Sequence, residues 1–213
     1  MINKELLKKD IFGEIWKLGT RGDFELLRDT RPSSWRLGWL ARALLRREAR
    51  ALAALTGVDG VPQLAKTDRT TLRRSYLQGL PLHQGRPDRV EYFNDAARLL
   101  RRLHRSGVAH NDLAKEPNLL VLNDGSPAFI DFQLAMYAPA RGCLFRIAAR
   151  EDIRHLLKHK RTYVPDSLTA RERSILDSPS LLSRGFMSVV KPVYLFVTRR
   201  LMGWSDREGA AER

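Results

Sequence analysis

Two short apolar runs around a five-residue turn constrain the fold of this chain more than any other feature. The runs are residues 119–122 and 128–130, and the residues between them read Asn-Asp-Gly-Ser-Pro. Turn residues between two apolar runs predict a β-hairpin. The hairpin would bring Asn118, before its first strand, close to Asp131, after its second. Because Mg²⁺ takes oxygen ligands and leaves its other positions to phosphates and water, these side chains form a candidate metal site.

The residues around this hairpin resemble the catalytic segments of the protein-kinase-like superfamily. Residues 110–113 read His-Asn-Asp-Leu, and residues 130–132 read Ile-Asp-Phe, as in the kinase catalytic loop and the Asp-Phe pair that follows it. The resemblance is closer to the small bacterial branches, namely RIO-type kinases and lipopolysaccharide-core sugar kinases. It implies Asp112 as catalytic base, and Asn118 and Asp131 as ligands of the Mg²⁺ that accompanies ATP.

The same resemblance implies an α+β, two-lobed fold, with a reduced, mainly-β small lobe and a short helical large lobe. We place the small lobe at residues 1–79 and the large lobe at residues 80–213.

The catalytic segment departs from the usual kinase pattern at several positions. Asn118 follows Asp112 by six residues where five are usual, so residues 114–117 must bulge by one residue. Gln133 stands where Gly usually follows the Asp-Phe pair, Asn111 replaces an Arg found in many kinases, and no Ala-Pro-Glu motif follows. These departures argue against control by activation-loop phosphorylation, and they remove the usual platform for a peptide substrate.

Three further residues are assigned to the catalytic loop or its support. Lys115, within the bulge, is a second candidate catalytic residue. His110 is expected to brace the loop and not to carry protons. The resemblance implies that Asp152, on a predicted helix at 151–157, accepts backbone hydrogen bonds from the loop; the alternative is a solvated helix face. Residues 155–161, rich in His, Lys and Arg, are interpreted as a basic surface.

Residues 10–31 predict a small β-sheet. Residues 15–18 and 24–27 are apolar runs around a loop at 19–23 that is rich in hairpin residues. A kinase-like small lobe needs glycine where backbone N–H groups approach phosphate oxygens. Gly13 is one candidate, and Gly19 with Gly22 is the other.

A helical stripe of apolar residues at 36–55 carries Glu48 on its apolar face. A carboxylate that faces a core is costly unless it is paired. In the resembled family a helix Glu pairs with a strand Lys that contacts the nucleotide phosphates, and Arg28 occupies that strand position here. We therefore predict an Arg28–Glu48 pair. The alternative is that Glu48 lies in an exposed run of arginines, and Lys17 is the reserve candidate for phosphate contact.

Residues 70–77 predict a strand that ends where the two lobes of the resembled fold join. Adenine binds backbone amides at that junction, so Tyr76 and Leu77 are assigned as nucleotide contacts by position alone. Residues 88–106 predict the next helix, which ends at Ser106-Gly107 and leads into the catalytic loop.

Composition limits the partners and the compartment. The net charge of +14 favours anionic partners such as a nucleotide, an acidic glycolipid or a membrane surface. Few aromatic residues are interleaved with the arginines, which argues against a nucleic-acid groove. A single cysteine and the lack of an apolar signal segment favour the cytoplasm. Residues 184–204 form a basic amphipathic segment that could bind the inner face of the membrane; the alternative is that it packs under the large lobe.

These observations predict a kinase that uses Mg²⁺ and ATP to phosphorylate a hydroxyl group. The acceptor is either Ser/Thr of a protein or a sugar of lipopolysaccharide or a related glycolipid. The alternative is a pseudokinase that binds nucleotide or partners without turnover, which Arg28 and the altered loop spacing would favour.

Overall fold

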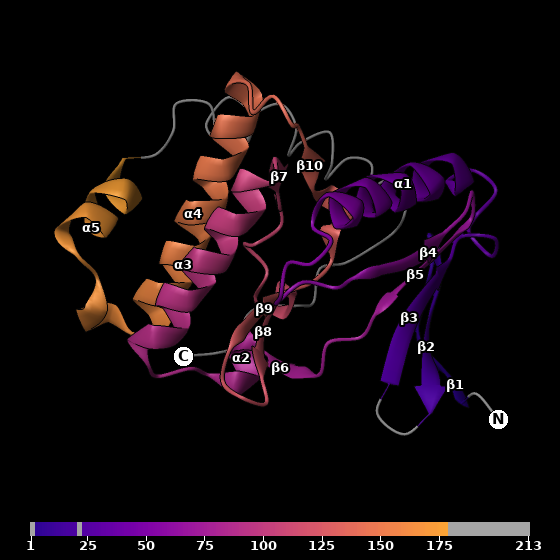
Figure 1. Ribbon diagram of the computed structural model, residues 1–213, viewed down its shortest axis with the longest axis horizontal. Helices are drawn as coiled ribbons and strands as arrows, with labels where there is room; N and C mark the ends of the chain where they lie inside the picture. Colours follow the sequence, from indigo (N-terminus) through magenta and orange to yellow (C-terminus); the bar gives the residue numbers. More distant parts are fainter. Residues whose placement is uncertain (1–2, 21–22, 179–213) are drawn as a thin grey trace.

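The computed structural model describes residues 3–20 and 23–178. These residues form an α+β fold of two lobes (Figure 1). One lobe is an antiparallel sheet with a single helix, and the other consists of helices packed on two small sheets. The predicted fold class is therefore confirmed.

The small-lobe sheet has five strands in the order β1-β2-β3-β5-β4, all antiparallel. They are β1 (Asn3–Asp10), β2 (Gly13–Thr20), β3 (Asp23–Asp29), β4 (Leu64–Thr67) and β5 (Thr71–Ser75). The predicted hairpin is the β2–β3 pair, with Ile15 opposite Arg28 and Leu18 opposite Glu25. The sequence analysis missed β1, because this edge strand is exposed on both faces and shows no apolar alternation.

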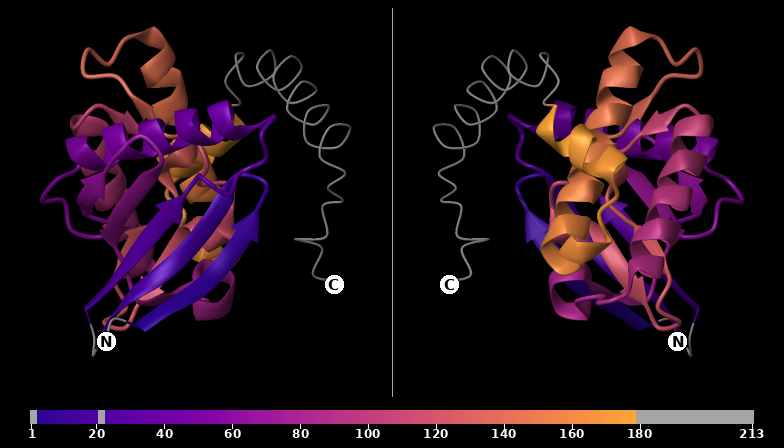
Figure 2. Two further views of the ribbon diagram at one scale, coloured as in Figure 1. Left: turned by 90° about the vertical axis from the view of Figure 1, so that its right-hand side faces the viewer. Right: turned by 90° about the vertical axis from the view of Figure 1, so that its left-hand side faces the viewer.

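Helix α1 (Gly38–Ala54) confirms the predicted helix at 36–55. Its buried residues recur every three or four positions, at Ala41, Leu45, Glu48 and Leu52. The helix runs across the upper ends of the sheet strands, as the left view of Figure 2 shows. Glu48 is buried with them, so the alternative of an exposed position for Glu48 is wrong.

The large lobe contains the predicted hairpin, which the structure confirms. Strands β8 (Leu119–Leu122) and β9 (Pro127–Phe129) pair antiparallel, and β6 (Gly79–Pro81) adds to the other edge of β8. A second small sheet pairs β7 (Val108–Ala109) with β10 (Met136–Tyr137). The helices are α2 (Leu82–Gly85), α3 (Val90–Arg105), α4 (Cys143–Tyr163) and α5 (Ala170–Asp177), with 3₁₀ turns η1 (Glu116–Asn118), η2 (Phe132–Leu134) and η3 (Pro165–Ser167).

One hydrophobic core crosses the boundary between the lobes. Its members include Leu52 of α1 and Leu55 just after that helix, and Phe93, Leu99, Leu103, Phe129, Phe132 and Leu156 of the large lobe. A shared core holds the two lobes in one packed unit. The division at residues 79 and 80 stays a proposal; the five-stranded sheet ends at Ser75, and the first strand of the large lobe begins at Gly79.

The interpretation of residues 155–161 as a basic surface is wrong for two of its members. His159 and Lys160 are buried, because α4 packs between α3 and α5 (Figure 1). The Lys160 ammonium donates to both carboxylate oxygens of Glu172, at 2.8 and 2.9 Å. Hydrogen bonds from Lys160 and Thr169 outweigh the burial that would raise the pKa of Glu172, and they hold it below its usual value.

Among residues 3–20 and 23–178, no helix is both long enough and apolar enough to cross a membrane. The amphipathic segment at 184–204 lies outside the described residues.

Candidate active site

The loop between β7 and β8 carries Asp112, and two consecutive turns fold it. The Lys115 amide donates to the Asp112 carbonyl at 3.4 Å, and the Asn118 amide donates to the Lys115 carbonyl at 3.1 Å. The second turn is η1, with proline at its second position. The extra residue between Asp112 and Asn118 is taken up in these turns.

Three of the predicted residues meet around the Asp112 carboxylate. Lys115 Nζ and Asn118 Nδ2 each donate to Asp112 Oδ2 at 2.9 Å. Asn118 Nδ2 also donates to the Asp112 backbone carbonyl at 2.9 Å. Since both donor hydrogens of the Asn118 amide are used in this way, its oxygen is the atom left to accept or to bind a metal. Asp112 and Asn118 are largely buried, whereas Lys115 is exposed.

Asp131 lies at the exit of the hairpin, in a backbone conformation that few residues adopt. Its φ is 64° and its ψ is 71°, a left-handed conformation that costs on the order of 1 kcal/mol and is found at functional sites. The Ile130 amide donates to the Asn118 carbonyl at 3.0 Å, so the hairpin does bring the neighbourhoods of Asn118 and Asp131 together. Asp131 Oδ1 is buried and has no hydrogen-bond partner among the described residues.

An unpartnered carboxylate oxygen on Asp131 and an amide oxygen on Asn118, on two segments joined by the Ile130–Asn118 hydrogen bond, suit a hard cation. Mg²⁺ is commonly held by one or two carboxylates together with substrate phosphates and water. The described residues contain no group of three or more His, Cys, Asp or Glu that could hold a metal. The donor set therefore suits an ion that arrives with phosphate ligands better than a closed metal site made by protein alone.

Asp152 lies under the catalytic loop and is almost fully buried. Its carboxylate accepts the amides of His110 at 2.7 Å and Asn111 at 2.8 Å, and it contacts His104 Nε2 at 3.2 Å. Asn111 has a φ of 62°, so these hydrogen bonds hold a strained turn. Sequence reasoning missed His104, because no local pattern distinguishes this residue in the last turn of α3 from a solvated histidine.

The His110 side chain spans from the catalytic loop to the Asp131 segment. Its Nε2 donates to the Ile130 carbonyl at 2.9 Å, and its ring lies 4.7 Å from that of Phe132. The ring is fully buried. This geometry places His110 as a brace between the two segments and away from solvent.

A second brace comes from α4, and the sequence analysis did not identify it. His159 Nε2 donates to the Leu113 carbonyl at 2.8 Å, and Tyr163 Oη donates to Glu116 at 3.0 Å. Burial lowers the pKa of His159. Burial, with the hydrogen bond to Glu116, raises the pKa of Tyr163 to about 12. Both side chains are therefore neutral at physiological pH and hold the loop by hydrogen bonds.

In the small lobe the structure brings the predicted pair together and adds a third residue. Arg28 Nη1 lies 3.3 Å from Glu48 Oε2, and Arg74 Nε lies 3.0 Å from Glu48 Oε1. Exposure of the three side chains is 10%, 1% and 12% for Arg28, Glu48 and Arg74. Two cations therefore share one buried carboxylate, which leaves an excess positive charge. The available signal for Arg74 was its position two residues after Leu72 in β5, which puts both side chains on one face of the strand.

Helix α1 also contacts the segment that follows Asp131. Arg47 Nη2 donates to the carbonyls of Leu134 and Ala135 at 3.1 and 3.3 Å. Asn111 Nδ2 donates to the same Leu134 carbonyl at 3.1 Å. The helix that carries Glu48 is thus fastened to both the catalytic loop and the Asp131 segment.

The residues assigned to the nucleotide by position have other partners in the structure. Gly13 has a φ of 127°, and a Cβ there would lie 2.1 Å from the Asp29 carbonyl oxygen, so packing alone requires glycine. The Tyr76 amide donates to the Phe24 carbonyl at 2.9 Å. Lys17 Nζ lies over the rings of Phe24 and Tyr76, at 4.1 and 4.5 Å. Leu77 lies in the connection between β5 and β6.

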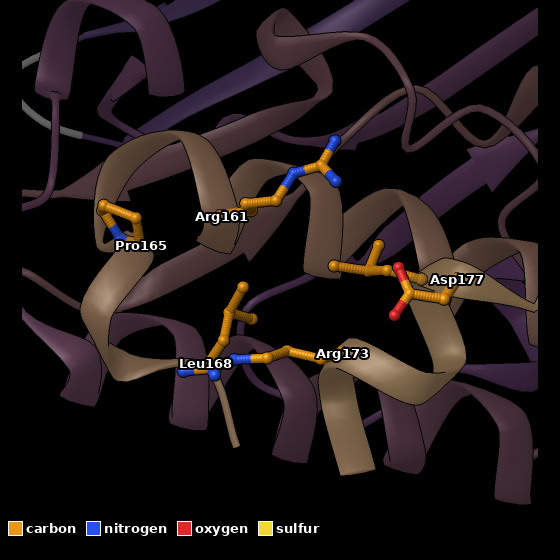
Figure 3. Close-up of a pocket in the computed structure, with 6 residues that line it drawn as sticks. Arg161, Pro165, Leu168, Arg173 and Asp177 are labelled. Carbon is orange, nitrogen blue, oxygen red and sulfur yellow. The ribbon is translucent and has the colours of Figure 1, made fainter. Parts of the chain in front are cut away.

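Two hollows lie on the large lobe, away from all of these residues. One, of about 300 Å³, lies between α4, η3 and α5, with Leu168 between the side chains of Arg161 and Arg173 (Figure 3). The other, of about 440 Å³, lies between the start of α3 and the β8–β9 turn. Neither hollow is lined by Asp112 or Asp131.

A family model described as the phosphotransferase enzyme family, APH, matches residues 22–141. The match includes Arg28, Glu48 and the loop from Asp112 to Asp131, and it ends before Asp152. A search of curated proteins finds no match.

Two crystal structures of the Rio2 kinase from Chaetomium thermophilum share the fold. Each has a TM-score of 0.59 and 18% identity and covers 83% of this chain, and one is a complex with ADP/Mg²⁺ and phosphoaspartate. The chain spans 62% and 60% of the length of those two structures. At this identity the likeness shows the fold alone, which is kinase-like.

Proposed function

This chain belongs to the phosphotransferase enzyme family, and from that premise we propose that it transfers the terminal phosphoryl group of ATP to a hydroxyl acceptor. The observation that carries the proposal is the cluster of Asp112, Lys115 and Asn118, joined through the hairpin to Asp131 with its unpaired, buried oxygen. A binding protein without turnover has no use for a carboxylate held by both a lysine and an amide beside a second, unpaired carboxylate.

In the proposed reaction Asp112 is the base. Lys115 and Asn118 hold its Oδ2, so we assign proton acceptance to Oδ1. The acceptor oxygen forms a bond to the terminal phosphorus as the bond from that phosphorus to the leaving oxygen of ADP breaks, and the hydroxyl proton passes to Asp112. We assign Lys115, which is exposed, to neutralise negative charge on the phosphoryl group during transfer.

The remaining residues are assigned to the nucleotide and its metal. The amide oxygen of Asn118 and the Asp131 carboxylate would hold Mg²⁺, which neutralises negative charge on the phosphates when bound. Arg28 would contact the phosphates from the small lobe, steadied by Glu48. Gly13, Tyr76 and Leu77 are kept as the nucleotide-binding region of the small lobe and its connection. Asp152 and His110 support the loop.

The acceptor class that we favour is a sugar of lipopolysaccharide or a related glycolipid. The net charge of +14 and the lack of an Ala-Pro-Glu segment support this proposal. The likeness to Rio2 kinase supports Ser/Thr of a protein as the second candidate. In either case we propose a cytoplasmic enzyme, with any membrane contact peripheral and at the inner face.

ATP turnover tests the proposal, with candidate acceptors and three variants. Asp112→Asn should lower the transfer rate by about 10²–10⁴-fold, the usual contribution of a positioned base, while nucleotide binding is kept. Asp131→Ala should abolish both transfer and Mg²⁺-dependent nucleotide binding. Asp166→Asn, at an exposed aspartate of η3, is the matched control and should transfer at the wild-type rate. Nucleotide binding with no transfer by the wild type to any acceptor would favour the pseudokinase alternative.

A further inference from the structure

An exposed aromatic patch lies at the start of α1, on residues that the proposed reaction does not use. Trp35 is 85% exposed and Trp39 is 64% exposed. The Ser34 amide donates to the Ile11 carbonyl at 3.1 Å, so the β1–β2 turn and its exposed Ile11 lie beside the segment that leads to these indoles. We call Ile11, Trp35 and Trp39 the tryptophan patch.

The surface around the tryptophan patch is strongly basic. Residues 31–50 contain six arginines and one acidic residue, Glu48. Because Glu48 is buried and paired with two arginines, it does not offset the charge at the surface. Arg31, Arg36, Arg46 and Arg50 are exposed. The Arg36 guanidinium lies 5.1 Å from the centre of the Trp35 ring, so cation and indole are presented together.

We infer that the tryptophan patch and the arginines around it bind the surface of an anionic lipid bilayer. Indole rings prefer the interface between hydrocarbon and water, because one part of the ring is apolar and its N–H needs a polar partner. Cations beside such residues are attracted to anionic headgroups. The patch supplies both features within a few residues, and its charge is complementary to that surface.

The exposure of the two indoles favours a bilayer over nucleic acid. Proteins that stack bases on aromatic rings usually do so within a positively charged groove that follows the phosphate backbone. Two exposed indoles, one of them beside the Arg36 guanidinium, fit insertion among headgroups.

The inference stands independently of the proposed phosphotransferase activity, because it concerns binding to lipid. The location of the tryptophan patch is still relevant to the choice of acceptor. Helix α1 carries Glu48, and its Arg47 is hydrogen-bonded to the segment after Asp131. Contact of this helix with a bilayer would hold the active site near lipid-linked hydroxyl groups.

Vesicle co-sedimentation of the full chain tests the inference. The protein should bind vesicles of phosphatidylcholine and phosphatidylglycerol at low salt, and bind vesicles of phosphatidylcholine alone much less. Trp35→Ala with Trp39→Ala should weaken binding by about tenfold per indole. This is the effect expected if each ring of the wild type removes roughly 60 Å² of apolar surface from water on binding. The matched control, Leu80→Ala with Ile153→Ala, removes two exposed apolar side chains elsewhere and should bind like the wild type.

The charge contribution has its own pair of variants. Arg36→Gln and Arg46→Gln should each weaken binding by about fivefold at low salt, the value for one cation near an anionic surface. Added salt should remove most of that difference. If the tryptophan variant binds as tightly as the wild type, another part of the chain, such as residues 184–204, binds the vesicles and the inference is wrong.

Fluorescence gives a readout that belongs to the patch alone. The sequence has four tryptophans, so the variant Trp16→Phe with Trp204→Phe keeps only Trp35 and Trp39. Without vesicles both indoles should be quenched readily by acrylamide. With anionic vesicles their emission should shift to the blue, and lipids with brominated chains should quench it. Indoles that are shielded before lipid is added, or that respond to single-stranded DNA and not to vesicles, would overturn the inference.

Discussion

Replacement of Glu48 by glutamine should destabilise the protein more than its single negative charge suggests. Glu48 is 1% exposed and holds Arg28 at 3.3 Å and Arg74 at 3.0 Å. When one partner of a buried ion pair is removed, the remaining charge is left without compensation, at a cost of about 3–5 kcal/mol. Two arginines lose their partner here, but each is 10–12% exposed, so we expect the free energy of unfolding to fall by about 3–5 kcal/mol and not by twice that amount.

Chemical denaturation of single and double variants separates the pairwise contributions. Arg28→Met with Glu48→Gln should cost less than the sum of the single changes, because both remove the same interaction. Arg28→Met with Arg74→Met should cost more than the sum, because Glu48 keeps one cation in each single variant and none in the double variant. Arg28→Lys should retain the pair, with weaker geometry than a guanidinium provides.

Arg73 is the matched control for Arg74. The two residues are neighbours in β5, but Arg73 pairs with Glu25 and its side chain is 43% exposed. Arg73→Met should therefore cost less than about 1 kcal/mol, the usual value of an exposed ion pair. If Arg73→Met and Arg74→Met cost the same, or if the effects of Arg28 and Glu48 simply add, Glu48 does not organise these arginines.

Three further changes test other parts of the structure. Asp152→Asn should lower the transfer rate and cost about 1–3 kcal/mol, because buried N–H groups of the catalytic loop lose an acceptor; turnover and urea denaturation measure the two effects. Gly13→Ala should destabilise by more than about 1 kcal/mol in the same denaturation, through strain at its positive φ. Gly142→Ala, in open space at the N-cap of α4, should cost less than Gly13→Ala, because only the N-cap preference changes. Burial depresses the folded-state pKa of His159, so the free energy of unfolding should be unaffected by this histidine above its unfolded pKa near 6.5 and should fall as the pH drops below that value. His159→Gln should reduce this loss of stability between pH 7 and pH 5. His83→Gln, at an exposed histidine, should not reduce it.

Local patterns in the sequence were enough to predict the elements that position the site. The turn at 123–127 between two apolar runs predicts the β8–β9 hairpin, and the apolar stripe at 36–55 predicts α1. Each prediction depends only on residues that are close in the sequence, so it does not depend on contacts with other elements. The buried position of Glu48 followed from the same stripe, because its spacing from the leucines is helical.

Residues that join distant segments could not be predicted in this way. His104 and His159 have no local pattern that distinguishes them from solvated histidines, yet they contact Asp152 and the Leu113 carbonyl. Lys160 lies in a run of basic residues, and its burial depends on Glu172, which is twelve positions later in the chain. Strand β1 has no buried face to impose an alternation of apolar residues. In each case the deciding contact comes from another element.

The Leu134 carbonyl connects the two halves of the proposed active site. Arg47 from α1 and Asn111 from the catalytic loop both donate to it, at 3.1 Å each. In many kinases the position of Asn111 is an Arg that reads a phosphorylated loop; here the Asn111 amide is held by Asp152 and its side chain by Leu134. The chain's own side chains thus fix the segment after Asp131 and the helix that carries Glu48 in one arrangement. It follows that the alignment of Arg28, Asp112 and Asp131 should not require phosphorylation of the protein. Protein that carries no phosphate, as shown by its mass, should therefore transfer phosphate at its full rate. A rate that rises severalfold after the protein is phosphorylated would contradict this argument.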